Sequence, residues 1–214
     1  MREKEKATRV ILVRHGETSF PQNRIYCDSK EDPALSSTGQ AQAKQAAEFL
    51  SLENVSAIYA SPSLRTRMTA EAIAAHHKYL SVNFDSDLVE RNFGDWEGMY
   101  FEEIESQFPM KYKEWKENQA AFKIGSGESV YDLAERVVPV ISKIITAHSG
   151  QTVVVVAHVG PIRVLLARAL NLPVEGYRQL AIDPASVTGV DYGVSQNNLI
   201  FMNFHGRHFK SKKY

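Results

Sequence analysis

Arginine and histidine side chains follow several predicted strands at the point where each strand ends. Arg14 and His15 come directly after a short apolar run, and His158 comes directly after a later one. Arg65 lies shortly after a third apolar run, in the first turn of a predicted helix. Because ligands of open parallel sheets bind beyond the carboxyl ends of the strands, we expect these side chains to meet at one edge. Guanidinium groups and helix N-termini complement an oxyanion, so the pattern predicts an anion site with phosphate as its natural ligand.

Short apolar runs rich in β-branched residues predict the strands that position these side chains. The runs 10–13 and 153–156 lack polar alternation, which is typical of strands buried on both faces of a parallel sheet. Shorter strand candidates lie at 55–59 and 82–84. The intervening segments have the three- and four-residue apolar spacing of helices. These helices are expected at 40–50, 63–77, 129–145 and 162–170.

The C-terminal part of the chain has a different pattern. Segments 187–192 and 199–204 predict two strands of an antiparallel hairpin at the sheet edge. Residues 93–124 are aromatic and mixed in charge, and they predict a small helical insertion. Pro139 lies inside the long helix expected before the late strand and should kink or divide it. The predicted fold class is α/β: a three-layer α/β/α sandwich with a mostly parallel central sheet, the edge hairpin and the insertion, in one domain over residues 1–214.

Composition excludes several classes of protein. The 214 residues include 25 Lys and Arg and 25 Asp and Glu, so the formal net charge is zero. Without a basic excess the chain is not expected to bind nucleic acid or an anionic membrane. No apolar run approaches the about 20 residues that a spanning helix needs, and no secretory signal is visible, which predicts a cytoplasmic protein. Cys27 is the single cysteine, so neither an internal disulfide nor a Cys-based zinc site can form.

Four ordered motifs resemble those of a known family, the histidine phosphatase superfamily, in its phosphoglycerate-mutase-like branch of small-molecule phosphatases. The first, Leu-Val-Arg-His-Gly-Glu-Thr, is the most specific. The resemblance extends from Val10 to about Asn203, which is nearly the whole chain. The motifs lie at residues 12–18, 61–65, 88–98 and 155–160.

The resemblance implies a role for each residue of the predicted site. His15 corresponds to the nucleophile of the family and Glu90 to the proton donor. Arg14, Arg65 and His158 correspond to the phosphate pocket. No metal and no other cofactor is implied, since guanidinium groups can supply the positive charge that magnesium would otherwise bring.

Other polar residues near the motifs have less defined roles. The hydroxyl of Thr18 is expected either to donate to a phosphate oxygen or to cap the following turn. The family often has an asparagine where this chain has Pro21, and Asn23 is expected to take its place in substrate binding. Glu128 lies in a segment that resembles a family segment near the site and equally suits a loop that caps a helix. Arg163 is expected to be a solvated or structural arginine.

The implied activity is metal-independent hydrolysis of a small phosphorylated metabolite to inorganic phosphate. It would proceed through a phosphohistidine on His15, with Glu90 as general acid and base. Three alternatives stay open: a phosphoglycerate mutase, a metal-dependent hydrolase with His15, His158 and Glu90 as ligands, and an inactive phosphate-binding module. The leaving group is also open among α-ribazole phosphate, phosphoserine, sugar phosphates and phosphoglycerate. An exposed edge strand at 199–204 would permit a homodimer.

Overall fold

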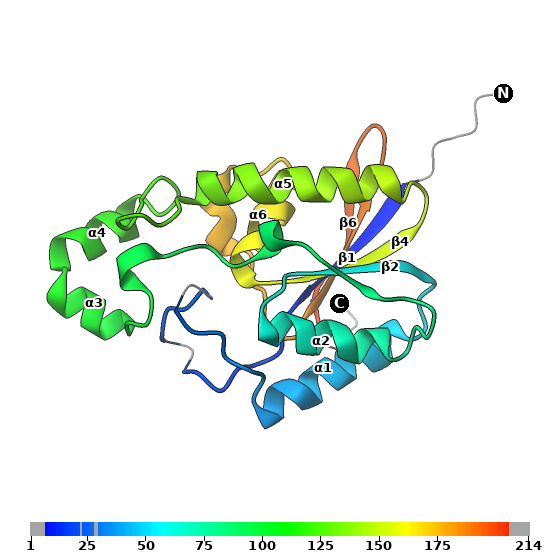
Figure 1. Cartoon of the computed structure of the whole chain (residues 1–214). Coiled ribbons are helices and arrows are strands. Elements are labelled where there is room, and N and C mark those ends of the chain that lie inside the picture. The colour runs from blue at the N-terminus through cyan, green and yellow to red at the C-terminus, as the bar shows by residue number, and fades with distance from the viewer. Residues whose placement is uncertain (1–6, 22, 28–29, 206–214) are drawn as a thin grey trace, which may run out of the picture.

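A six-stranded sheet forms the centre of the computed structural model, which describes residues 7–21, 23–27 and 30–205 (Figure 1). Its strand order is β3-β2-β4-β1-β5-β6. The first four strands in the chain run parallel to one another, whereas β5 is antiparallel to β1 and β6 is antiparallel to β5. The mostly parallel sheet with a C-terminal edge hairpin is therefore confirmed. The strands are β1 (Thr8–Arg14), β2 (Val55–Ala60), β3 (Val82–Phe84), β4 (Thr152–Ala157), β5 (Val187–Tyr192) and β6 (Asn197–Phe204).

Helices cover both faces of this sheet and complete the three layers (Figure 1). Side chains alternate in direction along β1, as the pleat of a strand requires. Val10 and Leu12 therefore join the apolar core beneath one helix pair, and Ile11 and Val13 join the core beneath the other. The first pair is α5 (Val130–Ala147) and α6 (Val159–Ala169), and the second is α1 (Ser37–Leu50) and α2 (Leu64–Ala74).

The register between β1 and β4 brings two functional candidates together. Arg14 pairs with Ala157, which is the last pair of the parallel ladder. The next residues are His15 and His158, and the backbone N–H of His15 donates to the carbonyl of Ala157 over 3.0 Å. Two histidines that are 143 positions apart in the numbering therefore leave the sheet side by side.

The predicted insertion forms a small apolar cluster at one end of the molecule, to the left in Figure 1. Trp96, Trp115 and Phe122 are buried in it, and the rings of Trp96 and Trp115 meet edge to face at 5.9 Å. These aromatic side chains hold the short helices against the segment that carries Glu90. The insertion contains η2 (Gly94–Trp96), α3 (Phe101–Gln107) and α4 (Pro109–Glu117). Two further short helices lie outside it: η1 (Ser86–Leu88) precedes it, and η3 (Val174–Gln179) follows α6.

Two expectations about helices were wrong. The helix expected to reach residue 77 ends at Ala74, because the N–H groups of His76 and His77 bond three residues back instead of four. Pro139 does not divide α5, which runs from Val130 to Ala147. The buried apolar face of α5 packs along the sheet on both sides of the proline, which outweighs the one backbone hydrogen bond that proline removes.

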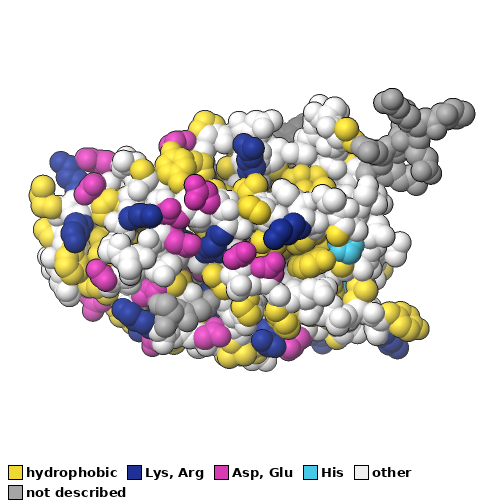
Figure 2. All heavy atoms as spheres, turned by 45° about the horizontal axis from the view of Figure 1, so that its top comes forward, with side chains coloured by type: hydrophobic (Ala, Val, Ile, Leu, Met, Phe, Trp, Pro, Cys, Tyr) yellow, Lys and Arg dark blue, Asp and Glu magenta, His cyan; other side chains and the backbone are white. Residues whose placement is uncertain are grey.

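The surface in Figure 2 carries lysine, arginine and acidic side chains interspersed with one another, in keeping with the balanced composition. No extended field of one sign lies over this face. Among the described residues, no helix is both long and apolar enough to cross a membrane.

Candidate active site

A cavity of about 430 Å³ lies where the parallel strands end. Most of the residues predicted for the site line it, although they come from three separate stretches of the chain. His158 lies behind the wall, and Asn23 lies outside the cavity lining. The predicted residues that do line the cavity are Arg14, His15, Thr18, Arg65 and Glu90.

His15 presents one ring nitrogen with a free lone pair. Its Nδ1 lies 2.8 Å from the carbonyl oxygen of Gly16. A carbonyl only accepts, so Nδ1 carries the proton and Nε2 does not. The side chain is 4% exposed, and burial, together with the charges of Arg65 and Arg14, lowers the pKa of His15 well below its ordinary value. A neutral imidazole with an available Nε2 is a competent nucleophile.

His158 is fully buried, and its ring lies edge to face with that of His15 at 5.2 Å. The Nη2 group of Arg65 donates to its Nδ1 over 3.0 Å, and its Nε2 lies 2.9 Å from the hydroxyl of Ser61. Burial, followed by the charge of Arg65, lowers the pKa of His158 well below its ordinary value. Both ring nitrogens therefore have hydrogen-bond partners within the protein, and the bond to Nδ1 fixes the orientation of the Arg65 guanidinium group.

Arg65 and Arg14 supply positive charge to the cavity. Arg65 is fully buried, stacks at 5.0 Å on the ring of Tyr26 and lies 3.4 Å from the carboxylate of Asp32. Arg14 donates from Nη1 to the carbonyl of Ile182 over 2.7 Å. Its buried Nε has no hydrogen-bond partner within the described ranges, and burial lowers the pKa of Arg14. Two guanidinium groups in the wall of one cavity favour an anionic ligand there.

Glu90 is held at the N-terminus of α6. The backbone N–H of Gly160 donates to both of its carboxylate oxygens, at 3.1 and 3.3 Å, and the N–H of Arg91 donates to Oε1 over 2.8 Å. A Cβ atom on Gly160 would lie 2.3 Å from Oε1 of Glu90. Only glycine therefore lets the carboxylate approach this helix end closely, and a helix N-terminus stabilises negative charge there.

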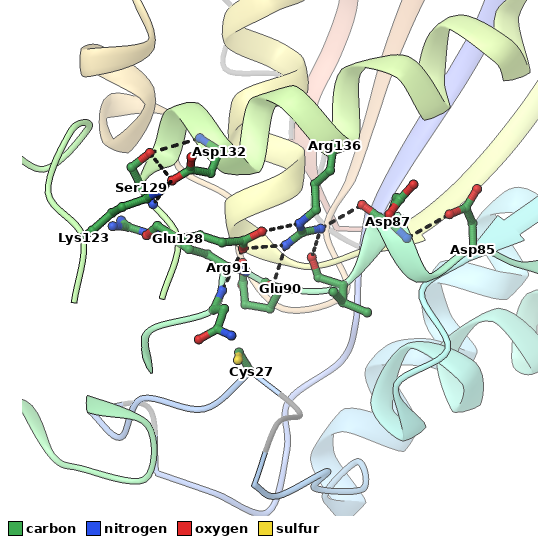
Figure 3. A network of polar contacts seen from close by, with 12 residues as sticks. Cys27, Asp85, Asp87, Glu90, Arg91, Lys123, Glu128, Ser129, Asp132 and Arg136 are labelled. Carbon is green, nitrogen blue, oxygen red and sulfur yellow. Dashed lines mark hydrogen bonds and ion pairs between the residues drawn. The ribbon is translucent and has the colours of Figure 1, made fainter. Parts of the chain in front are cut away.

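Arg136 on α5 and Glu128, which precedes that helix, form an ion pair that holds the backbone on both sides of Glu90, at Val89 and at Asn92 (Figure 3). Arg136 binds both oxygens of Glu128, from Nε at 2.6 Å and from Nη2 at 2.9 Å. Nη2 of Arg136 also donates to the carbonyl of Glu90, and Oε2 of Glu128 accepts from the N–H of Asn92, each over 2.9 Å. Both interpretations of the 125–129 segment therefore hold, because Ser129 caps α5 and Glu128 contacts the backbone next to Glu90.

Thr18 and Asn23 have different surroundings. The Thr18 hydroxyl lies in the cavity wall, 2.9 Å from the hydroxyl of Tyr26. The Asn23 amide is exposed and donates to the carboxylate of Glu102, so it does not take the place of the asparagine missing at Pro21. The prediction that Asn23 binds substrate is therefore not supported, because the loop turns its side chain toward α3.

Several cavity residues were not among the predicted site residues. Tyr26 is one of them, and no spacing in the sequence indicated it, since its position depends on how the loop after β1 folds back. Arg163 could have been found, because it lies three residues after Gly160 and four after Val159 on the same helix face. The others, Arg24 and Asp183, each have a counterion or hydrogen-bond partner: Arg24 pairs with Glu31, and Asp183 accepts from Asn203.

The residues that the structure describes contain no group of three or more His, Cys, Asp or Glu side chains that could hold a metal ion. His15 and His158 lie near Glu90, but Nδ1 of His15 and both nitrogens of His158 are already engaged. The donor set at this site is guanidinium, imidazole and backbone N–H, which suits an oxyanion.

The fold and the cavity define a class of protein: an α/β sandwich with a cationic pocket at the carboxyl edge of its parallel strands. The model of the histidine phosphatase superfamily (branch 1) matches residues 10–205 of the chain. The chain therefore belongs to the histidine phosphatase superfamily and is an enzyme of the phosphatase class.

Relatives of known sequence and structure have phosphatase names. Phosphoserine phosphatase 1 of Hydrogenobacter thermophilus is 32% identical over 195 residues, which are 91% of this chain and 92% of that protein. Glucosyl-3-phosphoglycerate phosphatase of Mycolicibacterium vanbaalenii is 32% identical over 179 residues, covering 80% and 78% of the two chains. A solved structure of a mycobacterial glucosyl-3-phosphoglycerate phosphatase with inorganic phosphate matches with a TM-score of 0.80 and 29% identity, covering 92% of this chain and 98% of that chain.

Proposed function

We propose that this chain is a metal-independent phosphomonoesterase that hydrolyses a small phosphorylated metabolite through a phosphohistidine on His15. The observation that carries the proposal is the bond from Nδ1 of His15 to the carbonyl of Gly16, which leaves Nε2 as a nucleophile in a cationic cavity. Glu90 lines the same cavity and serves as general acid and base.

The first step transfers the phosphoryl group to the enzyme. The Nε2 lone pair of neutral His15 attacks phosphorus in line, and the bond between phosphorus and the ester oxygen breaks. Protonated Glu90 gives its proton to the departing oxygen, so the leaving group departs as a neutral alcohol. Arg14 and Arg65 neutralise the equatorial phosphoryl oxygens, where charge stabilisation has most effect on phosphoryl transfer.

The second step returns the enzyme to its starting state. Water attacks the phosphorus of the phosphohistidine while the Glu90 carboxylate accepts a proton from that water. The bond between phosphorus and nitrogen breaks, and its electron pair returns to Nε2 of His15. Inorganic phosphate leaves, and Nδ1 keeps its proton on the Gly16 carbonyl throughout.

Trapping of the intermediate tests this mechanism. Rapid quenching during turnover of a ³²P-labelled phosphomonoester should leave an acid-labile label on the wild-type protein. His15→Ala should abolish both the label and nearly all turnover, whereas His76→Ala, which changes an exposed histidine on the far side of α2, should preserve both. Turnover that survives in His15→Ala would refute the proposal.

The acid-base role of Glu90 and the independence from metal are tested separately. Glu90→Gln should lower kcat by about 10²–10⁴-fold, which is the usual contribution of general acid-base catalysis, and should still bind inorganic phosphate. Activity of the wild-type enzyme should persist in excess chelator, because the guanidinium groups supply the charge. Loss of activity in chelator that returns with added metal would favour the metal-dependent alternative.

The substrate is proposed to lie among small phosphorylated metabolites, with phosphoserine and glucosyl-3-phosphoglycerate suggested by the names of the relatives. A panel of phosphorylated metabolites ranked by kcat/KM identifies it. A phosphoglycerate mutase assay primed with bisphosphoglycerate, run on the same preparation, separates hydrolysis from transfer within one substrate.

The domain organisation, cellular location and oligomeric state of the enzyme are part of the same proposal. We infer one domain with residues 93–124 as its insertion, a location in the cytoplasm and no nucleic-acid partner. Leu199 and Ile200 are 36% and 47% exposed on β6, the edge strand, and would allow two copies to pair there. Light scattering of the wild-type protein and of Ile200→Lys tests that homodimer.

A further inference from the structure

A side pocket of about 140 Å³ adjoins the main cavity on the side of Glu90. The two share several wall residues and therefore lie next to each other. The shared residues are Glu90, Phe93, Phe101, Val159 and Arg163. Since Glu90 is placed to protonate the ester oxygen, this side pocket is where the rest of the leaving group would lie.

Arg163 stands at the junction of the two pockets. It lies on α6, three residues after Gly160, and therefore on the helix face whose first N–H holds Glu90. Its Nε donates to the carbonyl of Leu180 over 2.8 Å, which fixes the plane of the guanidinium group. Neither Nη atom has an ion-pair or hydrogen-bond partner among the described residues, so both can donate to a ligand.

Arg163 and Arg14 are anchored on one short segment. Arg163 bonds to the carbonyl of Leu180 and Arg14 to the carbonyl of Ile182, two residues further on. Burial lowers the pKa of Arg163, and the charges of Arg178 and Arg14 add to this effect, whereas Tyr177 and Glu90 oppose it. Arg163 is thus an electrostatic neighbour of both the phosphate cradle and the general acid.

The walls of the side pocket are strongly cationic. Arg91, Arg163 and Arg178 line it, whereas Glu90 is the single acidic side chain among the described residues that do so. Arg91 is 2% exposed, and its Nε and Nη2 donate to the carbonyls of Glu128 and Phe122, each over 2.7 Å. Tyr177 also lines the pocket, and its side chain is hydrogen-bonded to Arg91. Arg91 is therefore held by the protein, and the excess of guanidinium groups in these walls indicates an anionic ligand.

We propose that Arg163 and the side pocket behind it bind a carboxylate on the leaving group, so that the enzyme selects phosphomonoesters of small hydroxy acids. This inference rests on the proposed function, since it assigns the part of the substrate that the phosphate cradle does not hold. A planar guanidinium with two free Nη groups matches the two oxygens of a carboxylate. The aromatic walls Phe93 and Phe101 exclude water around that contact and strengthen it.

Two matched pairs of substrates test the proposal. Phosphoserine and phosphoethanolamine differ only by the carboxylate, and 3-phosphoglycerate and glycerol 3-phosphate differ by a carboxylate against a hydroxymethyl group. The wild-type enzyme should prefer the carboxylate member of at least one pair by about 10- to 100-fold in kcat/KM, the range expected for one charge-assisted contact. Arg163→Gln should remove that preference, mainly by raising KM for the member that carries the carboxylate, whereas KM for the member without it should change far less.

Arg168→Gln is the matched control, because Arg168 lies on the same helix and is exposed. It should keep the preference. Two results would overturn the inference and leave the phosphatase mechanism intact. One is an equal loss of kcat/KM for both substrates of a pair in Arg163→Gln, and the other is equal kcat/KM for both substrates in the wild-type enzyme.

A binding measurement tests the carboxylate site independently of the proposed phosphatase reaction. Calorimetry with the His15→Ala variant should show tighter binding of phosphoserine than of phosphoethanolamine, and adding Arg163→Gln should make the two equal. Equal binding before that second change contradicts the carboxylate site. Selective binding together with an absence of turnover and of labelled histidine in the wild-type protein would instead refute the proposed function.

Discussion

Arg65 donates a hydrogen bond from Nη2 to Nδ1 of His158 over 3.0 Å, and this contact determines where the protons lie in a buried polar chain. A guanidinium group cannot accept, so Nδ1 of His158 is the acceptor and its proton is on Nε2, toward Ser61. His15 has the opposite arrangement, with its proton on Nδ1. The two rings are in contact, yet one exposes a nucleophilic nitrogen and the other braces an arginine.

Opposite tautomers of His15 and His158 are the first prediction. In ¹⁵N NMR spectra of the ligand-free protein at pH 7, His15 should carry its proton on Nδ1 and His158 on Nε2. The reason is that the carbonyl of Gly16 can only accept a hydrogen bond, whereas the guanidinium group of Arg65 can only donate one. Assignment comes from the His15→Asn and His158→Asn variants, each of which removes one set of signals. A signal for His15 with the proton on Nε2 would contradict the proposed nucleophile.

Acid should destabilise the fold before any carboxylate titrates. The pKa values of His15 and His158 are both lowered well below the ordinary value by burial and by neighbouring arginines, so the folded state excludes protons that the unfolded state binds. Stability is therefore retained above the unfolded-state pKa of about 6.5 and falls as the pH drops below it, by up to about 1.4 kcal/mol per pH unit for each histidine. Urea unfolding between pH 5 and pH 7.5 measures this slope.

The slope has an internal control. The pKa of His77 is also lowered, chiefly by burial, and acts in the same direction, so the wild-type slope is a sum over several groups. The His15→Asn and His158→Asn variants should each have a shallower dependence than the wild type. A free energy of unfolding that is flat over this range would show that the two rings take up protons in the folded state.

Gly160→Ala should impair catalysis with little effect on folding. The new methyl group would lie 2.3 Å from Oε1 of Glu90 and must displace the carboxylate from the N-terminus of α6. A displacement of about 1 Å can cost about 10²-fold in rate, so kcat should fall by that order. Gly176→Ala is the matched control, since the nearest atom to its added methyl group is the end of the Gln179 side chain at 3.6 Å. If Gly160→Ala and Gly176→Ala had equal kcat, catalysis would not depend on the close approach of the Glu90 carboxylate to Gly160.

The Glu128–Arg136 pair should act through Glu90. Glu128→Gln weakens the bidentate contact, loosens the backbone on both sides of Glu90 and should lower kcat by up to about 10²-fold. Affinity for inorganic phosphate, measured by calorimetry, should hardly change because Arg14 and Arg65 are untouched. Lys123→Gln removes the neighbouring ion pair with Asp132, which has no contact with Glu90, and should leave kcat unchanged. Loss of phosphate affinity in Glu128→Gln would point to a wider collapse of the site.

The strand ends explain why the core of the site could be predicted from the sequence. Unalternating apolar runs indicated parallel strands, and parallel strands bring their carboxyl ends to one edge, so Arg14, His15, Arg65 and His158 had to lie near one another. Glu90 was found through the motif around it and not through a periodic pattern. Helix ends were less accurate, as at Ala74, because the last turn of a helix depends on local hydrogen bonds and not on apolar spacing.

The sequence by itself determined which chemical groups are available, and the tertiary structure decided how each is used. His158 and His15 have the same side chain, but Arg65 donates to Nδ1 of His158, whereas Nδ1 of His15 donates to the carbonyl of Gly16. The sequence predicts a solvated or structural role for Arg163, and only the tertiary structure places it in the wall that both pockets share with Glu90. The physical reason is that hydrogen-bond donors and charges act over a few ångströms, so their roles depend on neighbours that are distant in the chain.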